Sequence, residues 1–144
     1  MGISSELAAK LLAMAIRFSG LPDMPADQLP FFVPMPAGEI EITQCRYIRT
    51  ACEGTVALYD HENYRIIILD TLDPNDPEDN SVIVHEMVHV LQYRNNRVPH
   101  PMTCKDVTRL ENQAYSAQNA YLRFEGSSSR WGQSATSTTC QDKY

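Results

Sequence analysis

The chain has 144 residues, a net charge of −6 and no apolar run long enough to span a bilayer. This length predicts one domain, residues 1–144, with a hydrophobic core of its own. Because no basic stripe is present to neutralise phosphates, the charge argues against a nucleic-acid partner, while the oligomeric state stays open.

The first predicted element is an amphipathic helix at Ser5–Phe18, within an N-terminal segment 1–20. Its leucines and alanines recur at helical spacing along one side, and Gly20 follows as a stop signal. Acidic and basic residues interrupt the apolar positions, and no basic stretch precedes them. The segment is therefore predicted to pack as a helix and not to act as a signal peptide.

Strands are predicted between this helix and the middle of the chain. Leu21–Pro36 is rich in proline, which predicts an extended connector. Glu39–Ile48 and Thr55–Tyr59 have the composition of strands, and Tyr64–Leu69, with three consecutive isoleucines, is the strongest strand prediction. We expect a hairpin between the last two strands. We also expect Tyr64–Leu69 to lie at a sheet edge, where an extended peptide could pair with it.

The segment His85-Glu86-Met87-Val88-His89 is the part of the sequence that predicts a chemistry. On a helix, residues four apart share a face, so His85 and His89 can bind a single metal ion. Glu86 flanks that ion, where it can take a proton from an activated water. The surrounding run Val82–Leu91 is apolar, and a carboxylate in the core is costly unless it is paired or lies at a metal. The alternative is a pair of buried, hydrogen-bonded histidines with Glu86 paired to an arginine.

Catalytic zinc takes three protein ligands and leaves one position open, so a third ligand is needed. The best candidate is Glu111, in a helix predicted at Lys105–Phe124. Thr103 and Asp106 have the spacing of a capping box at its start, and Gly126 follows it as a stop signal. The alternative for Glu111 is an ordinary solvated glutamate. His100 lies between two prolines, which predicts a loop.

The spacing of these residues resembles that of a known group of enzymes. His85-Glu86-x-x-His89, followed 22 residues later by Glu111 on a second helix, is similar to the gluzincin clan of zinc metallopeptidases. The resemblance covers about Tyr59–Leu122 and extends to small bacterial gluzincin-type domains. It implies that His85, His89 and Glu111 are zinc ligands and that Glu86 is the general base.

The sequence departs from the family pattern at two points. Thermolysin-type members carry an acidic residue one turn after the ligand glutamate, where this chain has Tyr115. The tyrosine or histidine that usually stabilises the oxyanion has no clear counterpart. Tyr93, Tyr115 and Tyr121 are the candidates, without a ranking among them.

The four cysteines have no C-x-x-C spacing, which argues against a cysteine zinc site. An even count in a small domain suits two disulfides in an exported, periplasmic or extracellular protein. Three pairings are open, and we favour Cys45–Cys52 and Cys104–Cys140. The second would tie the tail, residues 126–144, which is rich in serine and threonine, to the start of the Glu111 helix. The alternative is four reduced, buried thiols in a cytosolic protein.

Together these patterns predict an α+β domain with a small antiparallel or mixed sheet beside about three helices. The zinc would lie between the second and third helices. The expected function is that of a zinc-dependent metallopeptidase acting on an extended peptide or protein substrate. The competing hypothesis is a zinc-stabilised domain that binds a protein partner without catalysis.

Overall fold

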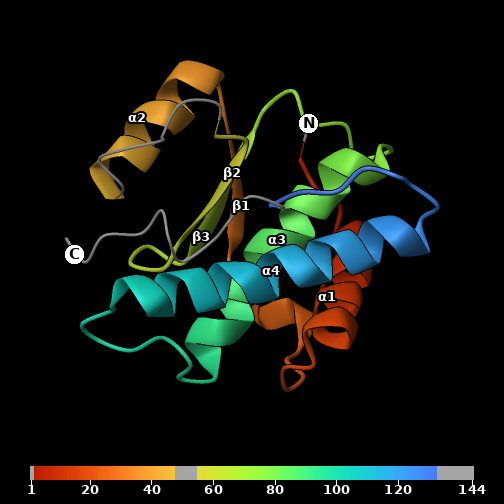
Figure 1. The fold of residues 1–144 in the computed structure, drawn as a ribbon. Helices are drawn as coiled ribbons and strands as arrows, with labels where there is room; N and C mark the ends of the chain where they lie inside the picture. The colour runs from red at the N-terminus through yellow and green to blue at the C-terminus, as the bar shows by residue number, and fades with distance from the viewer. Residues whose placement is uncertain (1, 48–54, 133–144) are drawn as a thin grey trace.

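In the computed structural model, which describes residues 2–47 and 55–132, helices pack around a small mixed sheet (Figure 1). The helices in the described residues are α1 (Ser5–Ser19), α2 (Ala37–Tyr47), α3 (Pro77–Arg94), α4 (Cys104–Phe124) and the short 3-10 helix η1 (Ala26–Gln28). The strands there are β1 (Phe31–Met35), β2 (Ala57–Asp60) and β3 (Arg65–Leu69). The α+β class predicted from the sequence is confirmed, with one α-helix more than the three expected.

Helix boundaries follow the signals in the sequence. The backbone N–H of Leu7 donates to Oγ of Ser4 at the start of α1, and Gly20 ends that helix in the left-handed conformation, with φ of 74°. At the start of α4, Thr103 and Asp106 form the predicted capping box. The predicted helices Ser5–Phe18 and Lys105–Phe124 are therefore confirmed to within one residue at each end.

The sheet has the strand order β1-β3-β2, with β1 parallel and β2 antiparallel to β3. The expected hairpin of β2 and β3 is confirmed. The expectation that Tyr64–Leu69 lies at a sheet edge is wrong, because β3 pairs on both sides. Its isoleucines explain this position: Ile66 and Ile68 join the core formed with α1 and α3, while the intervening Ile67 is fully buried on the opposite face. A strand covered on both faces is typical of a sheet centre.

Two segments before β2 differ from the predictions. Leu21–Pro36 is not only a connector, because it contains η1 and β1. Proline obscured β1, and the strand tolerates Pro34 because it lies at the sheet edge. The composition of Glu39–Ile48 predicts a strand, which is wrong for its described part, because that part belongs to α2. Among the side chains described in α2, Ile40 is buried, whereas Ile42 is 61% exposed.

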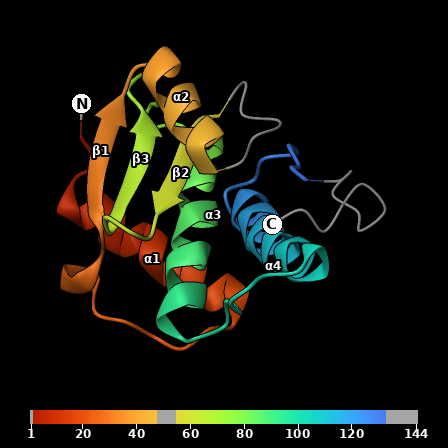
Figure 2. The ribbon, with the colours of Figure 1, turned by 90° about the vertical axis from the view of Figure 1, so that its left-hand side faces the viewer.

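Helix α3 occupies the centre of the molecule. It contacts α1, α4 and β2, and Figure 2 shows it between the sheet and α4. The apolar run of the sequence suits this central position. Val84, Met87 and Val88 are fully buried, and removing their side chains from water stabilises the fold. Residues on one side of α3 therefore face α4, and those near β2 face the sheet edge.

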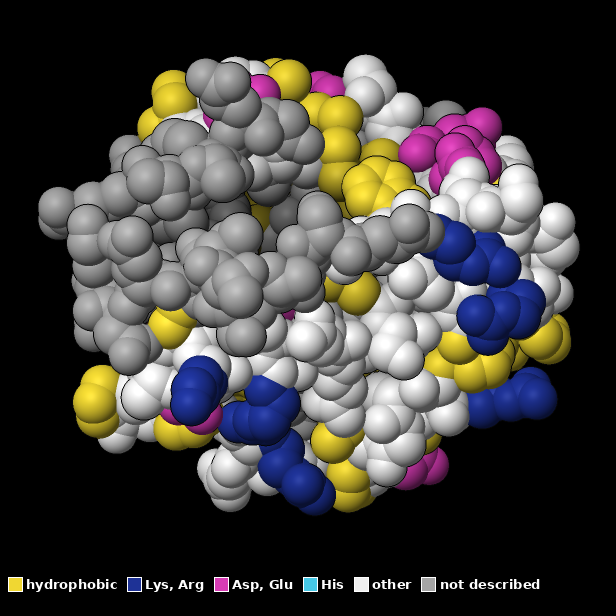
Figure 3. All heavy atoms as spheres, in the orientation of Figure 1, with side chains coloured by type: hydrophobic (Ala, Val, Ile, Leu, Met, Phe, Trp, Pro, Cys, Tyr) yellow, Lys and Arg dark blue, Asp and Glu magenta, His cyan; other side chains and the backbone are white. Residues whose placement is uncertain are grey.

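The surface carries both signs of charge. On the face drawn in Figure 3 the Lys and Arg side chains form separate groups, some of them beside acidic side chains. None of the described helices combines the length and the apolar character that crossing a bilayer requires.

Candidate metal centre

Helix α3 presents His85 and His89 one turn apart on the side that faces α4. Their Nε2 atoms lie 3.2 Å apart. The rings meet edge to face, with centroids 4.9 Å apart. This is the arrangement expected of an i, i+4 histidine pair whose ring nitrogens point at a common position.

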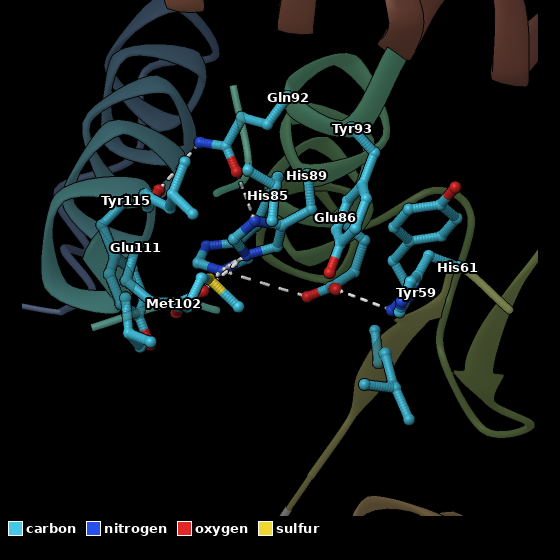
Figure 4. Close-up of a pocket in the computed structure, with 15 residues that line it drawn as sticks. Tyr59, His61, His85, Glu86, His89, Gln92, Tyr93, Met102, Glu111 and Tyr115 are labelled. Atoms are coloured by element: carbon cyan, nitrogen blue, oxygen red, sulfur yellow. Dashed lines mark hydrogen bonds and ion pairs between the residues drawn. The ribbon is translucent and has the colours of Figure 1, made fainter. Parts of the chain in front are cut away.

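Helix α4 supplies Glu111 to the same position. One carboxylate oxygen, Oε1, lies 2.5 Å from Nε2 of His89, and Oε2 lies 3.4 Å from Nε2 of His85. The three residues offer ligand atoms within 4.8 Å of one another and are the group in the described chain that could hold a metal ion. Figure 4 shows the three side chains pointing toward one another from the two helices.

The spacing of these atoms fits zinc. Nitrogen and oxygen ligands around a tetrahedral zinc, at bond lengths of about 2.0–2.1 Å, stand roughly 3.3 Å apart. The Nε2–Nε2 distance of 3.2 Å and the His85–Glu111 distance of 3.4 Å agree with that value. The shorter His89–Glu111 distance is that of a direct ion pair. Two imidazoles and one carboxylate are also one of the donor sets found in catalytic zinc sites.

Glu86 lies beside this group, between α3 and β2. Its Oε1 accepts a hydrogen bond of 2.9 Å from the backbone N–H of Tyr59, and its Oε2 lies 3.9 Å from Nε2 of His85. The strand therefore holds one oxygen of the carboxylate, and the other lies on the side of His85 (Figure 4). Neither oxygen lies within direct hydrogen-bonding distance of the His85 ring.

His89 and Glu111 share a proton-dependent interaction. Burial disfavours the charged form of His89, but the charge and the hydrogen bond of Glu111 outweigh that effect and raise the pKa of His89 to about 9. Burial also opposes ionisation of Glu111, yet the charge of His89 and hydrogen bonds from both histidines hold the pKa of Glu111 well below its usual range. Without a metal the two side chains thus form an ion pair.

Two buried glutamines contact the far side of the histidine rings. Nδ1 of His85 lies 2.9 Å from Oε1 of Gln118, and Nδ1 of His89 lies 2.8 Å from Oε1 of Gln92. The sequence analysis assigned no role to either residue. Gln118 lies on the same face of α4 as Glu111, seven residues on, and this spacing was the one sequence signal that could have linked them.

A cavity of about 520 Å³ opens at the histidines and Glu111. One wall carries Glu86, Tyr59 and Tyr93, and a second wall is apolar. The apolar wall consists of four side chains from the loop after α3 and the first turns of α4: Val98, Met102, Val107 and Leu110. The site therefore combines a polar floor with room for an apolar group.

The structure separates the three tyrosine candidates. Tyr93 and Tyr115 line the cavity, whereas Tyr121 is 1% exposed in the core and does not line it. The Tyr115 ring lies 4.5 Å from that of His85. Burial, followed by the charges of Glu111 and Glu86, raises the pKa of its phenol, which therefore keeps its proton at neutral pH. The pKa of the Tyr93 phenol is also raised, by burial and then by the charge of Glu62, so either of these two phenols can donate a hydrogen bond into the cavity.

The remaining histidines lie away from the ligand group. His100 lines a second, smaller cavity together with His61, Tyr64 and Tyr93, and is not a member of the ligand group. His61 follows β2 in a turn, as expected, and its ring stacks on Tyr93 with centroids 4.4 Å apart. It also borders the main cavity, which the sequence did not indicate.

The segment after α4 packs against Tyr115. Asn119 holds it through two hydrogen bonds to the backbone of Trp131, one donated by Nδ2 and one accepted by Oδ1. Gly132 follows with φ of 69°, and a Cβ added there would overlap the Tyr115 ring. The glycine thus allows the backbone to lie directly on the outer face of a cavity residue.

We expect Gly132→Ala to destabilise the protein more than Gly126→Ala does. Both positions have positive φ, which costs alanine about 1–2 kcal/mol, but a Cβ at Gly126 would meet nothing within 4 Å. Overlap with the Tyr115 ring adds about 1–3 kcal/mol. Urea unfolding of the two variants measures the difference. Equal losses of stability would show that the segment does not pack on Tyr115.

The disulfide predictions fall on residues outside the described part of the chain. Cys52 and Cys140 lie there, and no side chain is described for Cys45. Cys104 is buried in the first turn of α4. The pairing Cys45–Cys52 and Cys104–Cys140 stays a prediction, and so does the export that it implies.

Comparison with protein families gives one match, to a family described as Domain of unknown function (DUF6647), over residues 24–143. This range includes β1, the sheet, the ligand group and the cavity. Comparison with curated proteins and with solved structures finds no match.

Proposed function

Because the chain belongs to the DUF6647 family, whose description assigns no activity, we take its function from the site and propose a zinc-dependent hydrolase that cleaves peptide bonds. The observation that carries the proposal is the convergence of His85, His89 and Glu111 within 4.8 Å, beside the carboxylate of Glu86. We propose the gluzincin arrangement, in which the third ligand comes from the following helix.

Zinc, when bound by these residues, supplies a Lewis acid that lowers the pKa of a water toward about 7 and polarises a carbonyl. The role of Glu86 follows from the different surroundings of its two carboxylate oxygens. Oε1 is held by the N–H of Tyr59, so Oε2 faces the ligands and is free to accept the proton of the attacking water. The same carboxyl group can then donate that proton to the leaving amine.

Tyr115 is proposed to donate a hydrogen bond to the oxygen on which negative charge develops. Its ring borders the cavity next to His85, and its raised pKa keeps the phenol protonated. A donor aimed at developing charge in a site of low polarity contributes more than it would in water.

The cavity supports a neutral, partly apolar substrate. Among the described residues that line it there is no Lys or Arg, so none of these side chains supplies an arginine- or lysine-type partner for a terminal carboxylate. The apolar wall provides contacts for one aliphatic or aromatic side chain. We therefore propose internal peptide bonds of polypeptides as the substrate, with an apolar residue next to the bond that is cleaved.

Met102→Lys is expected to change this preference. A cation placed in the apolar wall should lower kcat/KM for substrates with Leu or Phe at the adjoining position by at least about tenfold, and should favour Glu or Asp there. Met102→Leu, which keeps the wall apolar, is the matched control. Cleavage-site profiles of the two variants on one peptide library give the comparison. Identical profiles would place the specificity pocket elsewhere.

The proposal is tested by incubating the zinc-loaded protein with a library of peptides blocked at both ends and detecting new termini by mass spectrometry. Cleavage between internal residues is the expected result. If the library stays intact while zinc occupies the site in full, the hydrolase proposal fails for these substrates and the zinc-stabilised binding domain gains support.

A further inference from the structure

Both histidines of the ligand group have a glutamine oxygen at Nδ1. Gln92 reaches His89 along α3, whereas Gln118 reaches His85 from α4. The two glutamines are 0% and 2% exposed, so neither side chain can exchange these partners for bulk water. A buried amide is retained at low cost only when its hydrogen bonds are made.

The other ends of the amides determine their orientation. Nε2 of Gln92 donates 2.9 Å hydrogen bonds to the backbone oxygen of Leu110 and to Oε1 of Gln113. Since a backbone oxygen can only accept, the amide nitrogen of Gln92 must face α4, and its oxygen must face His89. Nδ1 of His89 therefore carries the proton of that hydrogen bond.

The same reasoning applies to His85. The hydroxyl of Ser81 donates to the backbone oxygen of Glu78, so its oxygen is left to accept from Nε2 of Gln118, at 3.1 Å. This directs the amide oxygen of Gln118 at Nδ1 of His85, which must then be the donor. Both chains of hydrogen bonds thus end on a backbone carbonyl that cannot reverse its role.

We infer that Gln92 and Gln118 are positioning residues that hold a proton on Nδ1 of His89 and of His85, so that Nε2 is the nitrogen of each ring that binds a metal once the metal replaces the contacts with Glu111. The inference rests on the proposed zinc site. The two glutamines cross the α3–α4 interface in opposite directions, and the first is anchored one residue before Glu111. They therefore hold the ligands of both helices in place before a metal binds, and they add no buried charge in doing so.

Zinc affinity measured by chelator competition tests this inference. Gln92→Met and Gln118→Met keep the length of the side chain but remove the acceptor, and each is expected to weaken zinc binding by roughly 10- to 100-fold. Gln113→Met is the matched control, because within the described residues Gln113 bonds to the Gln92 amide and to the backbone oxygen of Ser19, and to neither histidine. It should change zinc affinity less than threefold, on the order of a lost peripheral hydrogen bond.

A second measurement does not depend on metal. Proton–nitrogen NMR of the metal-free protein is expected to show two Nδ1–H protons protected from exchange, and each methionine variant should lose the one that its glutamine held. Gln118→Glu retains an acceptor for His85 and should restore the proton and most of the zinc affinity. This rescue separates a hydrogen bond to the imidazole from a general effect on packing.

The results distinguish this inference from the proposed function. Two protected protons in a chain that binds no zinc would refute the zinc site while leaving the hydrogen-bonding of the rings intact. Zinc binding that the methionine variants leave as tight as in the Gln113→Met control would refute the inference, whether or not the protein cleaves peptides. Failure of Gln118→Glu to restore affinity would also contradict it.

Discussion

Glu86→Gln is expected to lose peptide hydrolysis while keeping its fold and its zinc. The new amide can still accept the hydrogen bond from the N–H of Tyr59 through its oxygen, so its nitrogen faces the ligands. An amide cannot accept the proton of the attacking water. Removal of a general base costs on the order of 100- to 10,000-fold in rate, and the loss could be larger here because Glu86 also serves the leaving amine.

The comparison uses kcat/KM on the best library substrate, with the zinc content of both proteins measured in parallel. Equal zinc content assigns the loss of rate to proton transfer. Cleavage by Glu86→Gln at the rate of the unmutated chain would mean that the activity belongs to a contaminant or to a mechanism without this carboxylate.

Glu111→Ala is expected to bind zinc far more weakly than the unmutated chain. Four-ligand protein zinc sites bind with about 10–16 kcal/mol, so the loss of one ligand costs on the order of 3 kcal/mol, or roughly 100- to 1,000-fold in affinity. The Glu111 carboxylate lies next to Nε2 of both histidines. Without it, the described ligand group consists of the two histidines alone. Chelator competition on protein purified without a metal-affinity tag measures the change.

Asn112→Ala is the matched control, because Asn112 follows Glu111 on α4, is exposed and lies outside the ligand group. It should bind zinc as the unmutated chain does. If Glu111→Ala also binds zinc as tightly as the unmutated chain, the third ligand lies elsewhere and the gluzincin arrangement is wrong for this protein.

The elements that carry the ligands could be predicted because their signals are local. The capping residues Thr103 and Asp106 determine where α4 begins, and helical spacing alone places His85 and His89 on one face of α3. Glu111 required a further assumption, namely that a zinc site needs a third ligand. That assumption identified a residue which the structure brings to the same position.

Predictions that depend on tertiary contacts were the ones that failed. The composition of Glu39–Ile48 suggests a strand, yet its described part is helical, and of the side chains described there Ile40 is the one that is fully buried. Strand β1 was not predicted because proline usually interrupts a strand, although Pro34 is tolerated in β1, which is an edge strand. Strand β3 is central because β1 and β2 pair with it on either side, and β1 was not predicted from the sequence.

The roles of Gln92 and Gln118 could not be derived from the sequence for a related reason. Glutamine is usually exposed, and its burial here depends on partners 18 to 37 residues away on the neighbouring helix. Tyr115 and Tyr121 could not be ranked from the sequence, and only the packing of α4 places the first at the cavity and the second in the core.

Zinc content and peptide cleavage, measured on one sample as zinc is removed and returned, test the central claim most directly. We expect about one zinc per chain, loss of cleavage in step with loss of zinc under a chelator, and recovery of both when zinc is restored. Cleavage that continues in the metal-free protein, or a fully zinc-loaded protein that cleaves no peptide of the library, would contradict it.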